Sequence, residues 1–140
     1  MIVLDTNIVS ELLRPLPEPK VERWLAARDG ATVFLTAVTE AELRYGIAVM
    51  PEGRRRAGLS LMLDSILRED FAGRILPFDS PAAEAFAAIA SARRLAGRPI
   101  AQADCQIAAI ARAAGAQVAT RNVRDFADCG IGIINPWEAE

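Results

Sequence analysis

Four carboxylates of this 140-residue chain fall at positions where a sheet of parallel strands would bring them together. Asp5 directly follows the apolar run Ile2–Leu4, and Asp125 comes shortly after a later apolar run. Glu42 and Asp104 each lie on an apolar stripe in the first turns of a predicted helix, where side chains lean back toward the helix N-terminus. Parallel sheets bind their ligands at the carboxyl ends of the strands. The four acids are therefore candidates for one shared site.

The chain has no histidine, which narrows the chemistry that such a site could perform. Ser-His-Asp catalysis, Cys-His catalysis and histidine-based zinc sites are excluded, so carboxylates must carry any acid–base or metal chemistry. Carboxylate oxygens suit a hard divalent cation such as Mg²⁺, which keeps several of its waters. A site of this kind activates water and holds a phosphodiester for in-line attack. The acids therefore point to metal-assisted hydrolysis of a phosphate ester.

Each acid taken alone also has a simpler structural interpretation. Asp5 could be only the N-cap of the next helix, and Asp104 could simply favour the positive end of a helix dipole. Glu42 could pair with an arginine such as Arg44, and Asp125 could be a solvated loop acid. The combination favours the metal site, because two of the four acids lie on predicted core-facing stripes, where a lone charge is costly.

Composition limits the class of protein further. Hydrophobic residues make up 52% of the chain and the net charge is −2, which excludes a disordered protein. No apolar run reaches the roughly 20 residues of a membrane span, and the N-terminus lacks the features of a secretory signal. Cys105 and Cys129 are expected to be reduced thiols of a cytoplasmic protein. A pI near 5.3 argues against coating of nucleic acid by bulk charge, although local arginine clusters could bind it.

Short apolar runs alternate with segments of helical spacing, which predicts an α/β fold with four or five mainly parallel strands flanked by helices. We expect strands at 2–4, 33–35, 75–78, 117–119 and 131–134. We expect helices at 6–14, 21–28, 38–50, 54–71, from Ser80 onward and at 101–114. Ser80 is expected to be an N-cap, and Gly115 is expected in a C-terminal cap. Proline and glycine are spread along the chain, so we expect a single domain over residues 1–140.

Six segments carry a family resemblance that extends over nearly the whole chain. They are Ile-Val-Leu-Asp-Thr-Asn (2–7), Thr-Ala-Val-Thr-Glu-Ala-Glu-Leu-Arg-Tyr-Gly (36–46), Phe-Ala-Gly-Arg-Ile-Leu-Pro-Phe-Asp (71–79), Ile-Ala-Gln-Ala-Asp (100–104), Thr-Arg-Asn-Val-Arg-Asp-Phe (120–126) and Asn-Pro-Trp (135–137). Their order and spacing resemble those of PIN-domain nucleases. The resemblance is closest to VapC-type toxins of bacterial toxin–antitoxin pairs, and among them to the Fit-type members. It implies a PIN-like three-layer sandwich of a mainly parallel sheet between helices.

The resemblance implies a Mg²⁺- or Mn²⁺-dependent endoribonuclease that hydrolyses RNA phosphodiesters with metal-activated water, and several relatives cleave tRNA. Asp5, Glu42 and Asp104 match the family's three metal-binding acids. The fourth position departs from the family, because Asn122 stands where many relatives have aspartate and the nearest acid is Asp125. An amide oxygen can still coordinate a cation but brings no charge. The missing charge bears on whether a second metal ion binds, and not on binding of the first.

The same resemblance implies supporting roles for polar residues around the acids. Thr6 and Asn7 would hold the first acid by hydrogen bonds. Thr120 and Asn122, together with Asp125, would complete the site or orient the attacking water.

Two further features are candidate contacts for RNA or for an antitoxin. Arg54, Arg55 and Arg56 are adjacent cations at a predicted helix start, where the helix dipole disfavours them unless phosphates or a partner lie nearby; a solvated helix start is the alternative. Trp24 is either a core residue, which its helical spacing favours, or part of an antitoxin groove between the second and fourth helices. The other wall of that groove would be Leu59, Met62, Leu63 and Ile66.

The resemblance also implies partners. Relatives bind a DNA-binding antitoxin of the VapB or FitA kind, and they form homodimers within a larger toxin–antitoxin complex. A cytoplasmic complex with no membrane contact is therefore expected.

Other functions stay open on the sequence alone. An aspartate-based phosphotransfer domain also has an acid after its first strand, but it needs a lysine late in the chain, and the single lysine here is Lys20. A catalytically degenerate PIN-like domain that binds proteins is a second alternative, which the change at Asn122 keeps open. No residue separates RNA from DNA as the substrate of the nuclease.

Overall fold

The computed structural model describes residues 1–139, and within them five parallel strands form one sheet in the order β3-β2-β1-β4-β5. The strands are β1 (Ile2–Leu4), β2 (Val33–Thr36), β3 (Ile75–Leu76), β4 (Gln117–Ala119) and β5 (Ile133–Ile134). The predicted strand count and direction are confirmed. The two outer strands are shorter than predicted, and in β3 the reason is local: Pro77 has no backbone N–H with which to extend the ladder.

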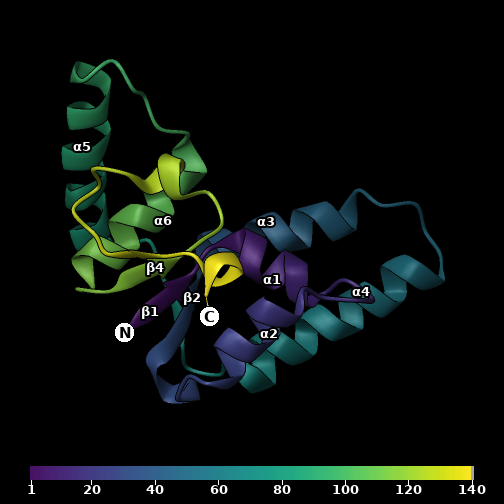
Figure 1. Ribbon diagram of the computed structural model, residues 1–140. Coiled ribbons are helices and arrows are strands. Elements are labelled where there is room, and N and C mark those ends of the chain that lie inside the picture. Colours follow the sequence, from purple (N-terminus) through teal and green to yellow (C-terminus); the bar gives the residue numbers. More distant parts are fainter. Residues whose placement is uncertain (140) are drawn as a thin grey trace.

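Helices cover both faces of this sheet (Figure 1). They are α1 (Thr6–Leu12), α2 (Pro19–Ala26), α3 (Ala37–Ala48), α4 (Arg54–Ser65), α5 (Ser80–Leu95) and α6 (Gln102–Ala113). Short helical turns follow at η1 (Gly30–Thr32), η3 (Val123–Phe126) and η4 (Pro136–Glu138), and a π-helical turn, η2 (Ile66–Asp70), continues α4. No helix among the described residues is both long enough and apolar enough to cross a membrane.

Two expectations about helix ends can be compared directly with the structure. The N-cap of α5 is Asp79, whose Oδ1 accepts a hydrogen bond from Ala82 N at 3.2 Å, so the prediction of Ser80 as the cap is wrong by one residue. Aspartate is as good a cap as serine, and the shift lets Ser80 and Pro81 become the first two helical residues. Gly115 follows α6 with φ of 68°, which confirms the predicted cap at that end.

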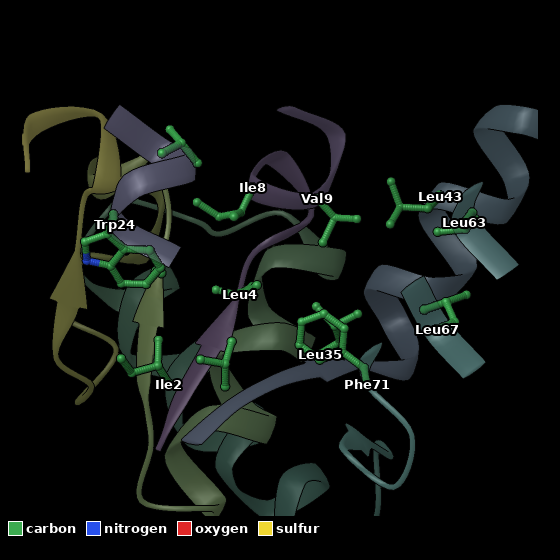
Figure 2. Packing of buried hydrophobic residues seen from close by; sticks show 13 residues of the cluster. Ile2, Leu4, Ile8, Val9, Trp24, Leu35, Leu43, Leu63, Leu67 and Phe71 are labelled. Carbon is green, nitrogen blue, oxygen red and sulfur yellow. The ribbon is translucent and has the colours of Figure 1, made fainter. Parts of the chain in front are cut away.

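The sheet separates two hydrophobic clusters, because successive side chains of a strand point to opposite faces. Ile2 and Leu4 of β1 pack with α1, α2, α3 and α4, whereas Val3 packs with α5 and α6. Figure 2 shows the first cluster, in which Leu4 and Leu35 of the sheet face Ile8 and Val9 of α1. The second cluster is rich in alanine from α6. The expected three-layer sandwich is confirmed, with the carboxyl ends of β1, β2 and β4 at one edge.

Candidate active site at the carboxyl edge of the sheet

Asp5 lies where β1 ends and α1 begins, and it is buried, with 4% of its surface exposed. Its Oδ1 accepts a hydrogen bond from Thr6 N at 2.7 Å, so it does cap α1, as the simpler interpretation proposed. Its Oδ2 accepts a second bond from the hydroxyl of Thr120 at 2.8 Å. Because each carboxylate oxygen has two lone pairs, both oxygens can still accept a further ligand. Capping and ligand binding are therefore compatible for this residue.

The hydroxyl of Thr120 links Asp5 to two asparagines. Thr120 Oγ1 accepts from Asn7 Nδ2 at 3.4 Å and from Asn122 N at 2.9 Å, and its single proton goes to Asp5. Asn7 therefore supports Asp5 through Thr120, which corrects the expectation that it binds the aspartate itself. Asn7 Oδ1 is buried and has no hydrogen-bond partner among residues 1–139, so this edge of the sheet holds an unused acceptor.

Glu42 reaches the site from α3 through a hydrogen bond with Thr6. The hydroxyl of Thr6 donates to Glu42 Oε1 at 2.7 Å, and its oxygen lies 3.0 Å from Thr39 Oγ1, which must then be the donor to Thr6. Glu42 is exposed, as is Tyr45 one turn later, so the predicted stripe does not face the core. The predicted location of Glu42 at the carboxyl edge of the sheet is consistent with the structure, but the expectation that its helical stripe faces the core is wrong.

The alternative that Glu42 is neutralised by Arg44 is also wrong. Arg44 Nε donates to Glu40 at 2.7 Å, and its Nη1 donates to Asp64 at 3.2 Å. Among residues 1–139 Glu42 forms no salt bridge with Arg44 or any other cation, and the hydroxyl of Thr6 orients its carboxylate.

Asp104 lies in the first turn of α6, with Ile107 and Ala108 of the same helix fully buried. Burial, followed by the charges of Asp5, Asp125 and Glu42, raises the pKa of Asp104 to about 6. The pKa of Asp5 is raised for the same reasons, first by burial and then by the charges of Glu42 and Asp125, against the lowering effect of its two hydrogen bonds. The structure therefore brings the four predicted acids close enough to repel one another.

Asp125 comes from η3, the turn that follows β4, and its side chain is exposed. The backbone of this turn is held by Arg93 of α5, which is buried with 6% of its surface exposed. Arg93 Nη1 donates to Asp125 O at 3.1 Å and to Ala127 O at 2.9 Å, and Arg93 Nε donates to Arg98 O at 2.8 Å. The sequence analysis missed Arg93. One signal was available: it follows Ile89 by four residues, on the apolar side of its helix.

The donor set fits a hard divalent cation. Among the described residues, no three carboxylates or thiols are arranged as a ready-made cage for one ion. Mg²⁺ does not need such a cage, because proteins usually hold it with one or two carboxylates, and waters and substrate phosphates supply the other ligands. Asp5 and Asp104 are suited to be those carboxylates, because a cation would offset the burial and the neighbouring negative charges that raise their pKa values.

Comparison with known proteins decides the family. Residues 2–131 match the model of the PIN domain. The chain belongs to the PIN-domain family. It is 44% identical over 138 residues to a protein named VapC ribonuclease Y4jK of Sinorhizobium fredii, covering 99% of both chains. It is 43% identical to Toxin FitB of Neisseria gonorrhoeae over 137 residues, covering 98% of this chain and 99% of that protein.

Solved structures support the same assignment. A chain in the structure of FitAB bound to an IR36 DNA fragment superposes with a TM-score of 0.93 at 41% identity, and the match covers all of this chain and 98% of that one. The resemblance to VapC-type and Fit-type PIN domains that the sequence motifs carried is therefore confirmed.

A groove of 920 Å³ adjoins the carboxylates of this PIN domain. Its walls come from α1, α3 and α4, and it is lined by Thr6, Glu42, Leu59 and Met62 together with ten other residues. The predicted groove between the second and fourth helices is therefore displaced, because α2 contributes nothing to this groove and Leu63 is buried. Ile66 lines a separate apolar cavity of 340 Å³.

The candidate contact residues of the PIN domain separate into three places. Arg54 and Arg55 line the groove, whereas Arg56 lines a smaller depression beside Arg44, so the three arginines do not form one patch. Trp24 is 6% exposed and packs in the first core cluster (Figure 2). Its core interpretation is confirmed, and the alternative that it is an exposed partner contact is wrong.

Proposed function

We propose that this PIN domain is a Mg²⁺- or Mn²⁺-dependent endoribonuclease that acts as the toxin of a toxin–antitoxin pair. The observation that carries the proposal is the gathering of Asp5, Glu42, Asp104 and Asp125 at one sheet edge, close enough to raise the pKa values of Asp5 and Asp104. The name of the Sinorhizobium relative supports RNA as the substrate. When bound, the cation would supply activation of water and charge stabilisation at the phosphate.

The residues around the edge have distinct parts in this proposal. Asp5 and Asp104 would hold the cation. Thr120 and Thr6 orient Asp5 through its two oxygens, and Thr6 also turns Glu42 toward the same point, where it would ligate directly or through water. Asp125 adds negative charge from η3. Asn122, which has no charge, uses its backbone N–H to hold Thr120.

The test is cleavage of a labelled pool of tRNA and structured RNA by the purified protein with Mg²⁺, with Mn²⁺ and with EDTA. We expect cleavage with either metal ion, none with EDTA, and a loss in Asp5→Asn and Asp104→Asn that exceeds the roughly 10–100-fold typical of residues that only support a metal ligand. Glu52→Gln, which removes an exposed acid outside the cluster, is the matched control and should cleave normally. A folded protein that cleaves no RNA with either metal ion would instead favour the degenerate binding module.

We also propose a DNA-binding antitoxin as partner and a homodimer as the assembled form. One related structure contains FitAB bound to a DNA fragment and another contains VapBC bound to DNA, and the groove beside Glu42 offers this chain an apolar surface for a partner segment. Arg54 and Arg55 in the groove would favour an acidic stretch of that segment. Co-expression with the protein encoded beside this one should give a complex with suppressed cleavage. Multi-angle light scattering should give twice the monomer mass for the protein alone.

A further inference from the structure

A second pocket, of 420 Å³, opens beside the carboxylate cluster. Glu11 and Arg14 of α1 and its following loop form one side, Glu18 lies at the next turn of the chain, and Arg121 and Trp137 form the other side. We call it the Trp137 pocket. Its volume lies within the range of about 300–1,000 Å³ that is common for small-ligand sites. The proposed catalytic chemistry uses none of its residues.

Three features place the Trp137 pocket next to the candidate active site. Arg121 directly follows Thr120, whose hydroxyl donates to Asp5. Glu11 follows Asn7 by four residues on α1, so the two share a face of the helix about 6 Å apart along its axis. The side chain of Arg14 lines both this pocket and the groove that contains Glu42. A strand of RNA at the carboxylates would therefore pass this pocket.

One wall of the pocket is formed by a cation–π pair. The guanidinium of Arg121 lies 5.1 Å from the centre of the Trp137 ring, and Arg121 is exposed while the ring is half-buried. The ring is held in place, because Trp137 N donates to Asn135 Oδ1 at 3.0 Å and Pro136 beside it is buried. Unpaired bases stack on aromatic rings and on guanidinium planes. The Arg121–Trp137 pair therefore offers a surface that a base can cover.

The opposite wall offers hydrogen-bond acceptors rather than a phosphate site. Glu11 is 6% exposed, and its Oε2 accepts from Arg14 Nη1 at 3.2 Å and from Glu18 N at 3.1 Å. The charge of Arg14 is thus engaged by Glu11, and two carboxylates balance two guanidinium groups around the pocket. A phosphate would meet these carboxylates unfavourably. The amino groups of adenine, cytosine or guanine would instead donate to them, and uracil has no amino group.

We propose, on the basis of the ribonuclease function above, that the Trp137 pocket binds one unpaired nucleotide next to the phosphodiester that is cleaved. Its base stacks on the Arg121–Trp137 pair, and an amino group of the base donates to the carboxylates of Glu11 and Glu18. The pocket thereby makes the enzyme prefer single-stranded RNA with an amino-bearing base at this position. Base preference then comes from Glu11, Glu18, Arg121 and Trp137 rather than from the four acids of the candidate active site.

The experiment measures binding of fluorescein-labelled hexaribonucleotides of adenosine, cytidine or uridine by anisotropy, on the full chain carrying Asp104→Asn so that no cleavage occurs. We expect the adenosine and cytidine oligomers to bind more tightly than the uridine oligomer. Adding Arg121→Ala should weaken adenosine binding about tenfold, the usual cost of losing one stacking contact. Adding Glu18→Gln should reduce the preference over uridine. Glu18 is the N-cap of α2, where its Oε1 accepts from Lys20 N at 3.4 Å, and a glutamine oxygen can accept the same bond. Arg124→Ala, an exposed arginine of the same loop outside the pocket, is the matched control.

The outcomes separate this inference from the proposed function. Three results would reject the proposal that the pocket binds a nucleotide. They are equal losses in Arg121→Ala and Arg124→Ala, equal affinity for the three oligomers, and no binding of any of them. Loss of antitoxin binding in Arg121→Ala with RNA affinity unchanged would reject it too, because the pocket would then belong to the protein partner. Cleavage by the parent chain is measured separately. Cleavage of RNA without an effect of Arg121→Ala on binding would reject only the role of the pocket. The effect on binding without any cleavage would reject only the nuclease function.

Discussion

The two faces of the sheet are built in different ways. Against one face, α6 presents Ala108, Ala109 and Ala111, all fully buried, and packs closely on α5. Against the other face, α1 to α4 use leucine, valine and aromatic side chains and leave an apolar cavity of 340 Å³ and a groove of 920 Å³. Small side chains let α5, α6 and the sheet approach one another closely, and a closely packed interior has little freedom to move.

The difference matters because the two faces supply different parts of the candidate site. Asp104 comes from α6, and Asp125 comes from the turn that α5 holds through Arg93. Glu42 comes from the open side and is exposed. We infer that the alanine-packed side sets the positions of Asp104 and Asp125, whereas the open side provides surfaces that partners can fill.

The largest effect is expected from filling the alanine-packed side. Ala108→Leu adds three carbon atoms to a fully buried position of α6, and overpacking of this kind should lower the free energy of unfolding by about 3 kcal/mol. Ala41→Leu on α3 adds the same atoms at an exposed position and should change it by less than about 0.5 kcal/mol. Urea unfolding followed by circular dichroism measures both. Similar values for the two variants would show that the sides do not differ in packing.

A smaller effect is expected from removing the arginine that holds η3. Arg93→Met keeps the length of the side chain but leaves the carbonyls of Asp125, Ala127 and Arg98 without this donor, which should cost about 2 kcal/mol. Hydrogen exchange of amides 123–129 should accelerate, and Mn²⁺ affinity should fall with the loss of a fixed Asp125. Arg94→Met at the exposed neighbouring position is the control. If Arg93→Met lowers stability without changing exchange in this segment, the arginine supports the fold but does not position the acid.

Sequence patterns were sufficient for the parts of the fold that depend on local order. A short apolar run such as Ile2–Leu4 and the helical spacing of α6 both follow from neighbouring residues, so five strands and the position of Asp104 could be predicted. Glu42 shows the limit of this reasoning. Its apolar stripe faces solvent, and Thr6, which is 36 residues away in the chain, brings it to the site.

The contacts that the sequence could not predict are long-range ones. Thr120 binds Asp5 across 115 residues, and Arg93 reaches carbonyls more than 30 residues away. Such pairs depend on where loops return after the strands have assembled. The groove was misplaced for the same reason, since helical spacing identifies an apolar face but not the helix that lies against it.

A still smaller effect, of opposite sign, is expected from Asp104→Asn. Because its folded pKa of about 6 lies above the ordinary aspartate value of 3.8, Asp104 lowers the stability of the metal-free protein as pH rises from about 4 to 6, and this penalty persists above 6. The variant should therefore be more stable than the parent at pH 7 by about 1 kcal/mol, allowing for the partial exposure of the group, and equally stable at pH 4.

Thermal unfolding in EDTA at the two pH values measures this difference, because other titrating groups cancel between the two proteins. Adding Mn²⁺ at pH 7 should raise the Tm of the parent much more than that of the variant. A variant that is less stable than the parent at pH 7 in EDTA would contradict the conclusion that burial and the neighbouring acids disfavour the charged form of Asp104.

The smallest effect on stability is expected on the open side. Met62 is 45% exposed and lines the groove, so Met62→Ala should change the free energy of unfolding by less than about 0.5 kcal/mol. If the groove is a partner surface, the same change should weaken the antitoxin complex about tenfold, since truncating a central apolar contact often costs more than 1 kcal/mol of binding. Leu61→Ala removes a neighbour that is more exposed, at 72%, and does not line the groove, so it should alter neither quantity. Isothermal titration of the two variants with the antitoxin measures both affinities. A weaker complex for Met62→Ala alone would show that the antitoxin fills the groove, whereas equal affinities for both would show that the groove does not bind it.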